Sequence, residues 1–564
     1  MGASVQNSIP RRDPALVMRL SRLGSMHQCR LSFMRVLTRR LANENWSFAR
    51  PVFDVDAKGV GHAVYTATGP ARTYSLVAFA HDLPPEERSD RVIATAWDAT
   101  FTLFDGVPTA DDIERLSHNI PYQEAGRVNE KSLSVSRANR SVRLWKHMVD
   151  ALAIGEQPDV DKVASVGYLM RTTAVYGSGK LGAADHETIA DRPEFDAPFQ
   201  VEMLSVFLTR AFVRDMINHM ARARGGAQAA ELALDIAHGL GIGNSTGLGM
   251  APFLINHPVL LNNWVAAREE AIARVRSLNT AQEAEANLFR SLFARVQVLV
   301  ETWRSEHPVQ IKKLVALKAD LEKVEAYLGG DDLTANSPWD RLLNWTSAAL
   351  SEEGQELIAS LILEPYGELV DDLSPAMSDH RPDASRILGT MSVKATRNLM
   401  RAGYAQALET DWSAQENCAR AWYVSEEKLE PRLGERFEEP IAEYEQPLSP
   451  GRDVALAFAD LKTWDDDALV SEFLMNHPEH RHSIRRVQIN ACAPYSEIQD
   501  NTICADMMPI DMLRYKLATF GATHFDPRSD RWLRICMFGN APYPEELTPE
   551  NADLWVYPDA EGNL

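Results

Sequence analysis

The stretch GLGIGNSTGLGMAPFLINHP, residues 239–258, decides how the middle of the chain is interpreted. It carries five glycines in its first eleven residues, and glycine loses more conformational freedom on folding than any other residue. Because it follows the helical pattern ALDIAH, we expect a loop between two helices here. His257 and Pro258 at its end are typical of the start of the next helix.

These glycines do not complete a dinucleotide-binding motif. The three positions where the last glycine of GxGxxG could fall hold asparagine, threonine and proline. A second cluster, AVYGSGKLG at residues 174–182, has Ala174 and Leu181 where a phosphate loop needs glycine and a hydroxyl side chain. Glycine-rich backbone can still bind an anion through exposed N–H groups, and it can equally form tight turns between helices.

The order Asn-Ser-Thr, Met, Pro, Asn within residues 244–256 is similar to the mobile loop of fumarase and aspartase-type lyases, which carries serines, Met-Pro, a lysine and Asn-Pro. This chain differs in that Ala251 interrupts Met-Pro, Leu254 replaces the lysine and His257 interrupts Asn-Pro. Residues 247–249 are additional. The resemblance implies a lyase as one reaction class, and no catalytic serine is assigned from it.

Composition restricts the class of protein. The chain has 564 residues, of which 45% are hydrophobic, so it has ample material for several cores and is not expected to be disordered. A net charge of -21 disfavours nucleic acid as a partner. No apolar run reaches 18 residues, so no membrane span is predicted. Five cysteines without a CxxC spacing indicate neither a disulfide framework nor a thiolate zinc site, and a cytoplasmic location is expected.

The N-terminal part of the chain is basic. Residues 14–42 contain six arginines and no acidic residue, a composition found in transit peptides. The alternative is a basic helix that packs on the acidic remainder of the protein. The apolar residues Leu31, Met34, Leu37 and Leu41 have the spacing of a buried helix face, which favours the second interpretation.

The pattern of apolar residues predicts a mainly α, multi-subdomain helical protein with a small N-terminal antiparallel β-sheet and a mixed α/β C-terminal tail. Alternation around a Gly-Pro turn in residues 60–80 predicts a hairpin, and Val92–Phe104 is a third strand candidate. Helical spacing recurs at 199–224, 227–238, 259–277, 281–304 and 309–328, and a strand is expected at Trp532–Phe538. The expected organisation is a basic helical segment at 1–50, the small sheet at 51–108, a helical core with the glycine-rich loops at 109–330, a second helical block at 331–425, an acidic linker at 426–452 and a mixed domain at 453–564.

Basic and acid–base residues near the two glycine-rich stretches are the candidate site. Arginine and lysine suit a carboxylate or phosphate, and histidine titrates near neutral pH. The predicted catalytic residues are His186, Asp185, Ser245 and His257. The predicted substrate-binding residues are Arg171, Lys180, Tyr176, Ser178, Asn244, Thr246 and Arg140.

A separate cluster, NHPEHRH at residues 476–482, places three histidines within six residues. His477, His480 and His482 could therefore bind a metal ion together with a carboxylate, either Glu479 or an aspartate from a distant part of the chain. The spacing matches no strong zinc motif, and Pro478 also fits the first position of a helix, so a helix start with exposed polar residues is the alternative.

These observations favour an enzyme that acts on a small anionic metabolite by lyase- or hydrolase-type acid–base chemistry, in a pocket lined by residues 176–182 and 241–250. No organic cofactor is predicted and a metal ion is left open; no nucleic acid or membrane partner is expected, and a homo-oligomer is compatible with the assignment. One alternative is a non-enzymatic helical interaction protein that uses the basic N-terminus and residues 426–452 as contact surfaces. The other is a metal-dependent enzyme centred on the histidine cluster.

Overall fold

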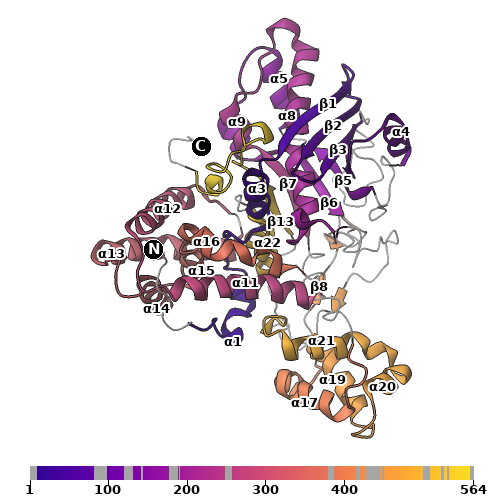
Figure 1. The fold of residues 1–564 in the computed structure, drawn as a ribbon, viewed down its shortest axis with the longest axis vertical. Coiled ribbons are helices and arrows are strands. Elements are labelled where there is room, and N and C mark those ends of the chain that lie inside the picture. Colours follow the sequence, from indigo (N-terminus) through magenta and orange to yellow (C-terminus); the bar gives the residue numbers. More distant parts are fainter. Residues whose placement is uncertain are drawn as a thin grey trace.

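The structure is a computed structural model of the chain (Figure 1). It describes residues 9–81, 98–119, 131–141, 144–176, 189, 191–247, 257–305, 307–378, 387–414, 420–422, 424–425, 428–429, 445–447, 450–499, 509–522, 526–529 and 532–558. No helix within these ranges is long and apolar enough to cross a membrane.

The centre of the molecule is a nine-stranded sheet with the order β1-β2-β3-β4-β5-β6-β7-β13-β12. Its strands are β1 (Ser47–Val55), β2 (Gly61–Thr68), β3 (Thr73–Ala80), β4 (Ala99–Asp105), β5 (Ser132–Arg140), β6 (Tyr168–Tyr176), β7 (Gly241–Gly247), β12 (Asp526–Ser529) and β13 (Trp532–Met537). The expectation of a small sheet confined to residues 51–108 is therefore wrong. The sheet draws on both halves of the chain, and β7 pairs with β13 about 290 residues later.

The predicted hairpin is present, since β2 and β3 pair from Gly61 opposite Ala80 to Thr68 opposite Thr73. The strand expected at Trp532–Phe538 is also present as β13. By contrast β5, with the sequence SLSVSRANR, alternates polar and apolar residues only over its first five positions and has a single β-branched residue, so its strand signal is short and weak. Its pairing with β4 and β6 forms the strand despite this local composition.

Helix α8 (Gln200–Gly225) lies against the sheet and contacts strands β2 to β7 (Figure 1). The Phe212 ring lies 5.4 Å from Phe101 of β4 and 6.3 Å from Tyr65 of β2. The Phe207 ring lies 6.1 Å from Phe48 of β1 and 5.3 Å from Phe538, which directly follows β13. Because one helix residue reaches strands near both ends of the sheet, the sheet curls around α8.

The basic N-terminal segment forms α1 (Pro14–Val17), α2 (Leu20–Leu23) and α3 (Phe33–Asn43). Most of its arginines are turned inward, whereas Arg19 is exposed. Arg35 donates to both carboxylate oxygens of Glu364 and to Asp553, and its side chain is fully buried. Arg30 pairs with Asp371 and Asp553. The segment therefore packs on acidic groups of the same chain and does not present these arginines as a contact surface.

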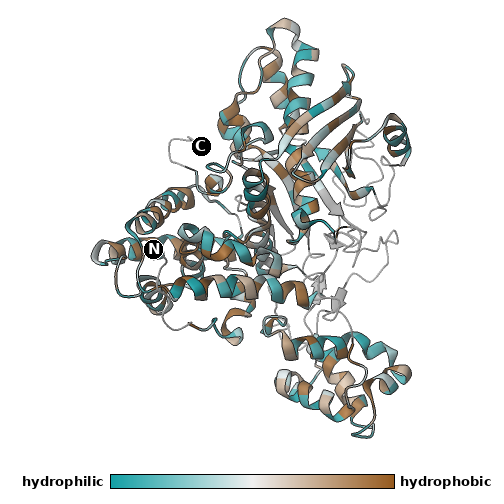
Figure 2. Ribbon diagram, in the orientation of Figure 1, coloured by the Kyte–Doolittle hydropathy of each residue, from teal (hydrophilic) through white to brown (hydrophobic). Residues whose placement is uncertain are grey.

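A helical layer follows β7 and agrees with the predicted periodicity. It consists of α11 (Pro258–Arg276), α12 (Glu283–Thr302), α13 (Pro308–Gly330), α14 (Pro338–Ala349), α15 (Glu352–Leu361) and α16 (Gly367–Val370). Gln282 and Glu285 form a capping box at the start of α12. Figure 2 shows hydrophobic and hydrophilic residues alternating along these helices, as expected where one face enters the core.

Residues 387–492 contain a further set of helices with a hydrophobic core of its own (Figure 1). We call it the helical module, and its central residues include Met400, Phe458 and Phe473. Its elements are α17 (Val393–Gly403), α18 (Ala405–Glu409), α19 (Pro450–Leu461), α20 (Val470–Asn476), the 3-10 turn η7 (Pro478–His480) and α21 (Arg481–Cys492). Short strands between them pair as β8 (Arg420–Trp422) with β11 (Glu445–Pro447) and β9 (Val424–Ser425) with β10 (Lys428–Leu429).

Smaller elements complete the described chain. Helices α4 (Ala110–Asn119), α5 (Trp145–Ala153), α6 (Val160–Ala164) and α9 (Leu234–Gly239) lie between strands, and α22 (Pro509–Phe520) precedes β12. The 3-10 turns are η2 (Pro193–Phe195), η3 (Gly226–Gln228), η4 (Glu364–Tyr366), η5 (Asp371–Met377), η9 (Pro544–Glu546) and η10 (Leu554–Val556). Helix α22 contacts β13 and β12, and this places it beside β7, the next strand of the sheet.

Candidate functional site

Among the described strands, β6 and β7 are the one parallel pair of neighbours in the large sheet. Arg171 lies opposite Gly243 and Thr172 opposite Asn244. Because parallel strands run in the same direction, Tyr176 and Gly247 end β6 and β7 at the same edge of the sheet. The two glycine-rich stretches expected to line one pocket therefore begin from adjacent strands. Of the predicted residues, Ser178, Lys180, Asp185 and His186 lie outside the described residues.

The glycines at residues 241–247 belong to a strand, and the expected loop between two helices is wrong at these positions. Gly239 ends α9, and β7 begins two residues later. A side chain at Gly243 would place its Cβ only 2.6 Å from the Tyr168 ring of β6. A Cβ at Gly241 would collide with the carbonyl oxygen of Met537 in β13. Glycine is thus required because the neighbouring strands and the tyrosine ring approach the backbone closely.

A polar contact that the sequence did not reveal lies on this strand pair. The Lys516 ammonium of α22 donates to Asn244 Oδ1 at 2.7 Å, and Asn244 Nδ2 donates to Thr172 Oγ1 at 3.4 Å. All three side chains are buried. Burial lowers the pKa of Lys516 to about 7. Lys516 sits in the apolar helical sequence DMLRYKLATF, where nothing local distinguishes it from a surface lysine.

Arg171 is buried as well, but it precedes Thr172 in β6 and so its side chain points to the opposite face of the sheet. Asn139 of β5 lies opposite it in register. The two predicted substrate-binding residues Arg171 and Asn244 therefore lie on adjacent strands without facing each other. The prediction that Arg171 binds substrate therefore concerns the opposite face of the sheet.

The other predicted residues near these strands are placed differently. Tyr176 pairs through its backbone with Val135, and Ser245 and Thr246 pair with β13. His257 is exposed and precedes Pro258, which starts α11 as expected. Arg140 lies opposite Met170, away from the edge where β6 ends. Its guanidinium lies 5.0 Å from the Trp145 ring centre and donates to the carbonyl oxygen of His81. These contacts give Arg140 a structural role.

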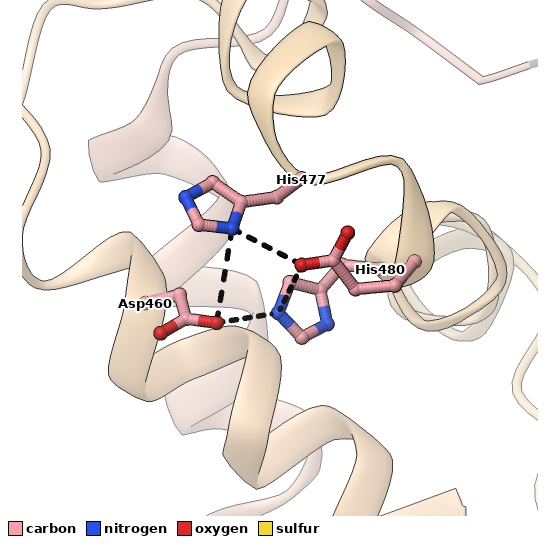
Figure 3. Close-up of side chains that lie close together, drawn as sticks. Asp460, His477 and His480 are labelled. Atoms are coloured by element: carbon pink, nitrogen blue, oxygen red, sulfur yellow. Dashed lines mark hydrogen bonds and ion pairs between the residues drawn. The ribbon is translucent and has the colours of Figure 1, made fainter.

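The structure brings together two of the three histidines of the 476–482 cluster. His477 and His480 lie together with Asp460 and Glu479, and one ligand atom from each falls within 4.8 Å of the others (Figure 3). His482 is not in this group. Burial and the positive charges of Arg481, Arg485 and Arg486 lower the pKa of His482. Asp460 was missed because it is 17 residues before His477 in the sequence and joins it only through the fold.

Family models, curated proteins and solved structures were each compared with the chain, and none of the three comparisons finds a match.

Proposed function

We propose that the chain is an enzyme that acts on a small anionic metabolite by lyase- or hydrolase-type acid–base chemistry. The observation that supports this is the register of β6 and β7, which brings Thr172 opposite Asn244 at the point where Lys516 reaches the sheet. Ligand sites of open sheets with parallel strands lie outside the carboxyl ends of those strands. We place the site on the face of the β6–β7 pair where Lys516 reaches Asn244, three residues before β7 ends, and expect it to open toward the edge at which the two strands end.

Lys516 supplies both a charge and a proton-transfer group in this proposal. A buried ammonium attracts a carboxylate or phosphate more strongly than an exposed one because the surroundings have a low dielectric constant. A lysine with a pKa of about 7 is present in both protonation states near neutral pH, as a general acid or base must be. Asn244 and Thr172 orient the amine and offer further hydrogen bonds.

The test is a thermal-shift screen of the full chain against small carboxylates and phosphates, because a ligand that binds the folded state raises its melting temperature. We expect at least one anion to raise the melting temperature of the wild type. Lys516→Met keeps the length of the side chain and removes its charge, and it should abolish that rise. Arg171→Met, a buried cation on the opposite face, is the matched control and should preserve it.

Circular dichroism spectra of both variants must match the wild type before the shifts are compared. If no anion shifts the wild type, or if Lys516→Met responds as strongly as the wild type, the proposal is wrong. A response lost in Arg171→Met and kept in Lys516→Met would move the site to the other face of the sheet.

A further inference from the structure

We propose that Asp460, His477, Glu479 and His480 form a binding site for one divalent transition-metal ion in the helical module (Figure 3). The proposal is independent of the one made for the edge of β6 and β7, since it concerns other residues with a core of their own. The geometry of the four side chains, the surroundings of the two imidazoles and the combined charge of the four residues support it.

The fold brings the four residues together from the ends of two helices. Asp460 is the penultimate residue of α19, and His477 directly follows the last residue of α20. Pro478 then starts the short turn η7, which ends at His480. The C-terminal end of a helix carries a partial negative charge, so the end of the twelve-residue helix α19 adds to the attraction for a cation.

The distances between the ligand atoms suit a small metal ion. His480 Nε2 lies 2.7 Å from Asp460 Oδ2, and His477 Nδ1 lies 3.2 Å from Glu479 Oε1. The pairs His477–Asp460 and His480–Glu479 are each 4.0 Å apart at the same atoms. Four ligands at normal zinc bond lengths in a tetrahedron are roughly 3.4 Å from one another. The four distances bracket that value, and all four ligand atoms lie within 4.8 Å of one another, so a small closing movement of the side chains would complete the site.

Both imidazoles are held against Phe473, which is fully buried in the core of the module. The His480 ring is nearly parallel to Phe473, at 4° and 5.9 Å, and the His477 ring is at 23° and 4.9 Å. This stacking leaves a ring nitrogen of each histidine directed at the carboxylates (Figure 3). An apolar wall that fixes ligand orientation is a normal part of a metal site.

The composition of the set indicates the class of metal. Two carboxylates carry the two negative charges that neutralise a divalent ion, and two neutral imidazoles complete the coordination. Imidazole with carboxylate suits zinc, cobalt, nickel and copper, whereas magnesium and calcium prefer oxygen ligands throughout. Glu479 is exposed and Asp460 is half-buried, so the ion can enter from solvent.

The chain offers a matched control in the first turn of the next helix, α21. His482 lies two residues after His480, but it is outside the group and lies among arginines that would repel a cation. A protein that bound metal merely through surface histidines would lose as much affinity from a change at His482 as from one at His480.

The experiment uses the full chain without a polyhistidine tag, stripped with a chelator and titrated with Zn²⁺ by calorimetry and with Co²⁺ by visible absorption. We expect one equivalent of metal per chain and a Co²⁺ spectrum typical of four ligands. His480→Asn and Asp460→Asn should each weaken binding by about 100-fold or more, since even the loss of a group that only orients a ligand costs 10- to 100-fold. His482→Asn should stay within about threefold of the wild type, because it removes no ligand.

Asp460→Asn is included because it keeps the shape of the side chain and an acceptor oxygen for His480. If its circular dichroism spectrum is unchanged, a loss of metal affinity results from the lost charge and not from misfolding. Binding below one equivalent, equal losses at His480 and His482, or wild-type affinity in both ligand variants would each overturn the proposal.

Discussion

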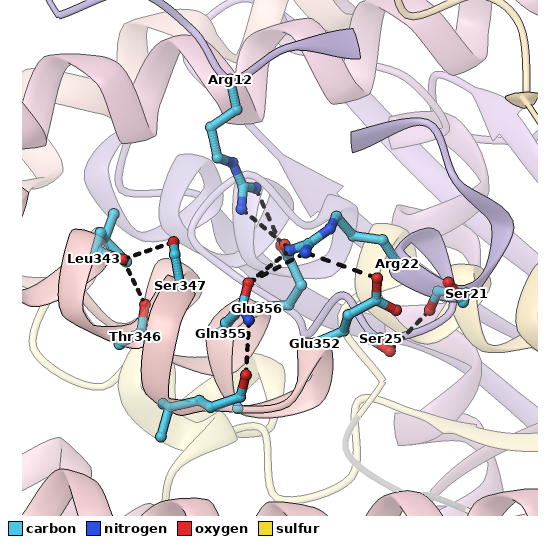
Figure 4. A network of polar contacts seen from close by, with 12 residues as sticks. Arg12, Ser21, Arg22, Ser25, Leu343, Thr346, Ser347, Glu352, Gln355 and Glu356 are labelled. Carbon is cyan, nitrogen blue, oxygen red and sulfur yellow. Dashed lines mark hydrogen bonds and ion pairs between the residues drawn. The ribbon is translucent and has the colours of Figure 1, made fainter. Parts of the chain in front are cut away.

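Arg12 and Glu356 are 344 residues apart in the sequence, yet Arg12 Nη1 lies 2.8 Å from Glu356 Oε1 (Figure 4). Arg22 donates to the same oxygen at 2.8 Å, and Arg268 donates to the other carboxylate oxygen. The Glu356 side chain is completely buried. One carboxylate therefore joins the N-terminal segment to α11 and α15.

Removal of this carboxylate should be costly. Glu356→Gln removes the buried carboxylate that Arg12, Arg22 and Arg268 share, although Glu269 still pairs with Arg12 and Arg268, so we expect a loss of about 3 kcal/mol in the free energy of unfolding, measured by chemical denaturation. Lys146→Ala, which breaks the exposed i,i+4 pair with Asp150, should change it by at most about 0.5 kcal/mol. Equal effects of the two substitutions would contradict the central role of Glu356.

A second buried carboxylate gives a prediction about acid. Burial by itself raises the pKa of Glu353, but the charge of Arg514 and the hydrogen bond with His27 lower it from 4.5 to about 2. A lowered pKa stabilises the folded state fully above the unfolded value, and this stabilisation is lost as the pH falls from about 4.5 to 2. We expect the wild type to lose about 3 kcal/mol from this group over that range. Chemical denaturation should show that Glu353→Gln is less stable than the wild type at pH 7. Its free energy of unfolding should also decrease less than that of the wild type as the pH falls.

Glu202 in the first turn of α8 predicts the opposite pH dependence. It is buried, and its Oε1 has no hydrogen-bond partner within the described ranges. Burial raises its pKa from 4.5 to about 8. Since the unfolded chain releases this proton more readily, the group destabilises the fold progressively as the pH rises from 4.5 to 8.

Glu202→Gln should therefore stabilise the protein in alkaline solution, by about 4–5 kcal/mol at pH 8 or above, and have little effect below pH 4.5. Unfolding curves at several pH values measure the difference between variant and wild type. A difference that does not grow with pH would show that Glu202 is ionised in the folded state.

Two glycines near β7 form a matched pair for a packing test. Gly243→Ala brings a methyl group within 2.6 Å of the Tyr168 ring, and overpacking of this kind costs about 1–3 kcal/mol. Gly239→Ala meets no heavy atom within 4 Å, so it should leave the melting temperature unchanged or slightly raised. If Gly243→Ala melts like Gly239→Ala, the close approach of β6 and β7 is not as described.

The sequence predicts the elements whose pattern is local. Helices such as α8 and α12 carry an apolar stripe over many turns, and the β2–β3 hairpin alternates around a Gly-Pro turn. Strands β5 and β7 escape prediction because they are polar or glycine-rich and are held by neighbours from distant parts of the chain. Their identity as strands depends on tertiary pairing, which a local pattern does not contain.

The residues of the candidate sites also divide into those that a local sequence pattern brings together and those that only the fold brings together. His477 and His480 lie three residues apart in the sequence, whereas Asp460 reaches them only because α19 packs against η7 and α21. The sequence does not distinguish Lys516 from a surface lysine, because its burial arises from the contact between α22 and the sheet. Arg171 and Asn244 lie on adjacent strands, and their opposite orientation follows from the register of β6 and β7.

The pairing of β7 with β13 also governs when this protein can fold. After residues 241–247 have left the ribosome, almost 300 more residues must be synthesised before the partner strand β13 emerges. During this time the backbone N–H and C=O groups on one side of β7 are unpaired. Closing so long a loop is slow, and chains that stop short of Trp532 would keep that edge available to one another. Newly made and truncated chains are therefore the forms of this protein most prone to aggregate.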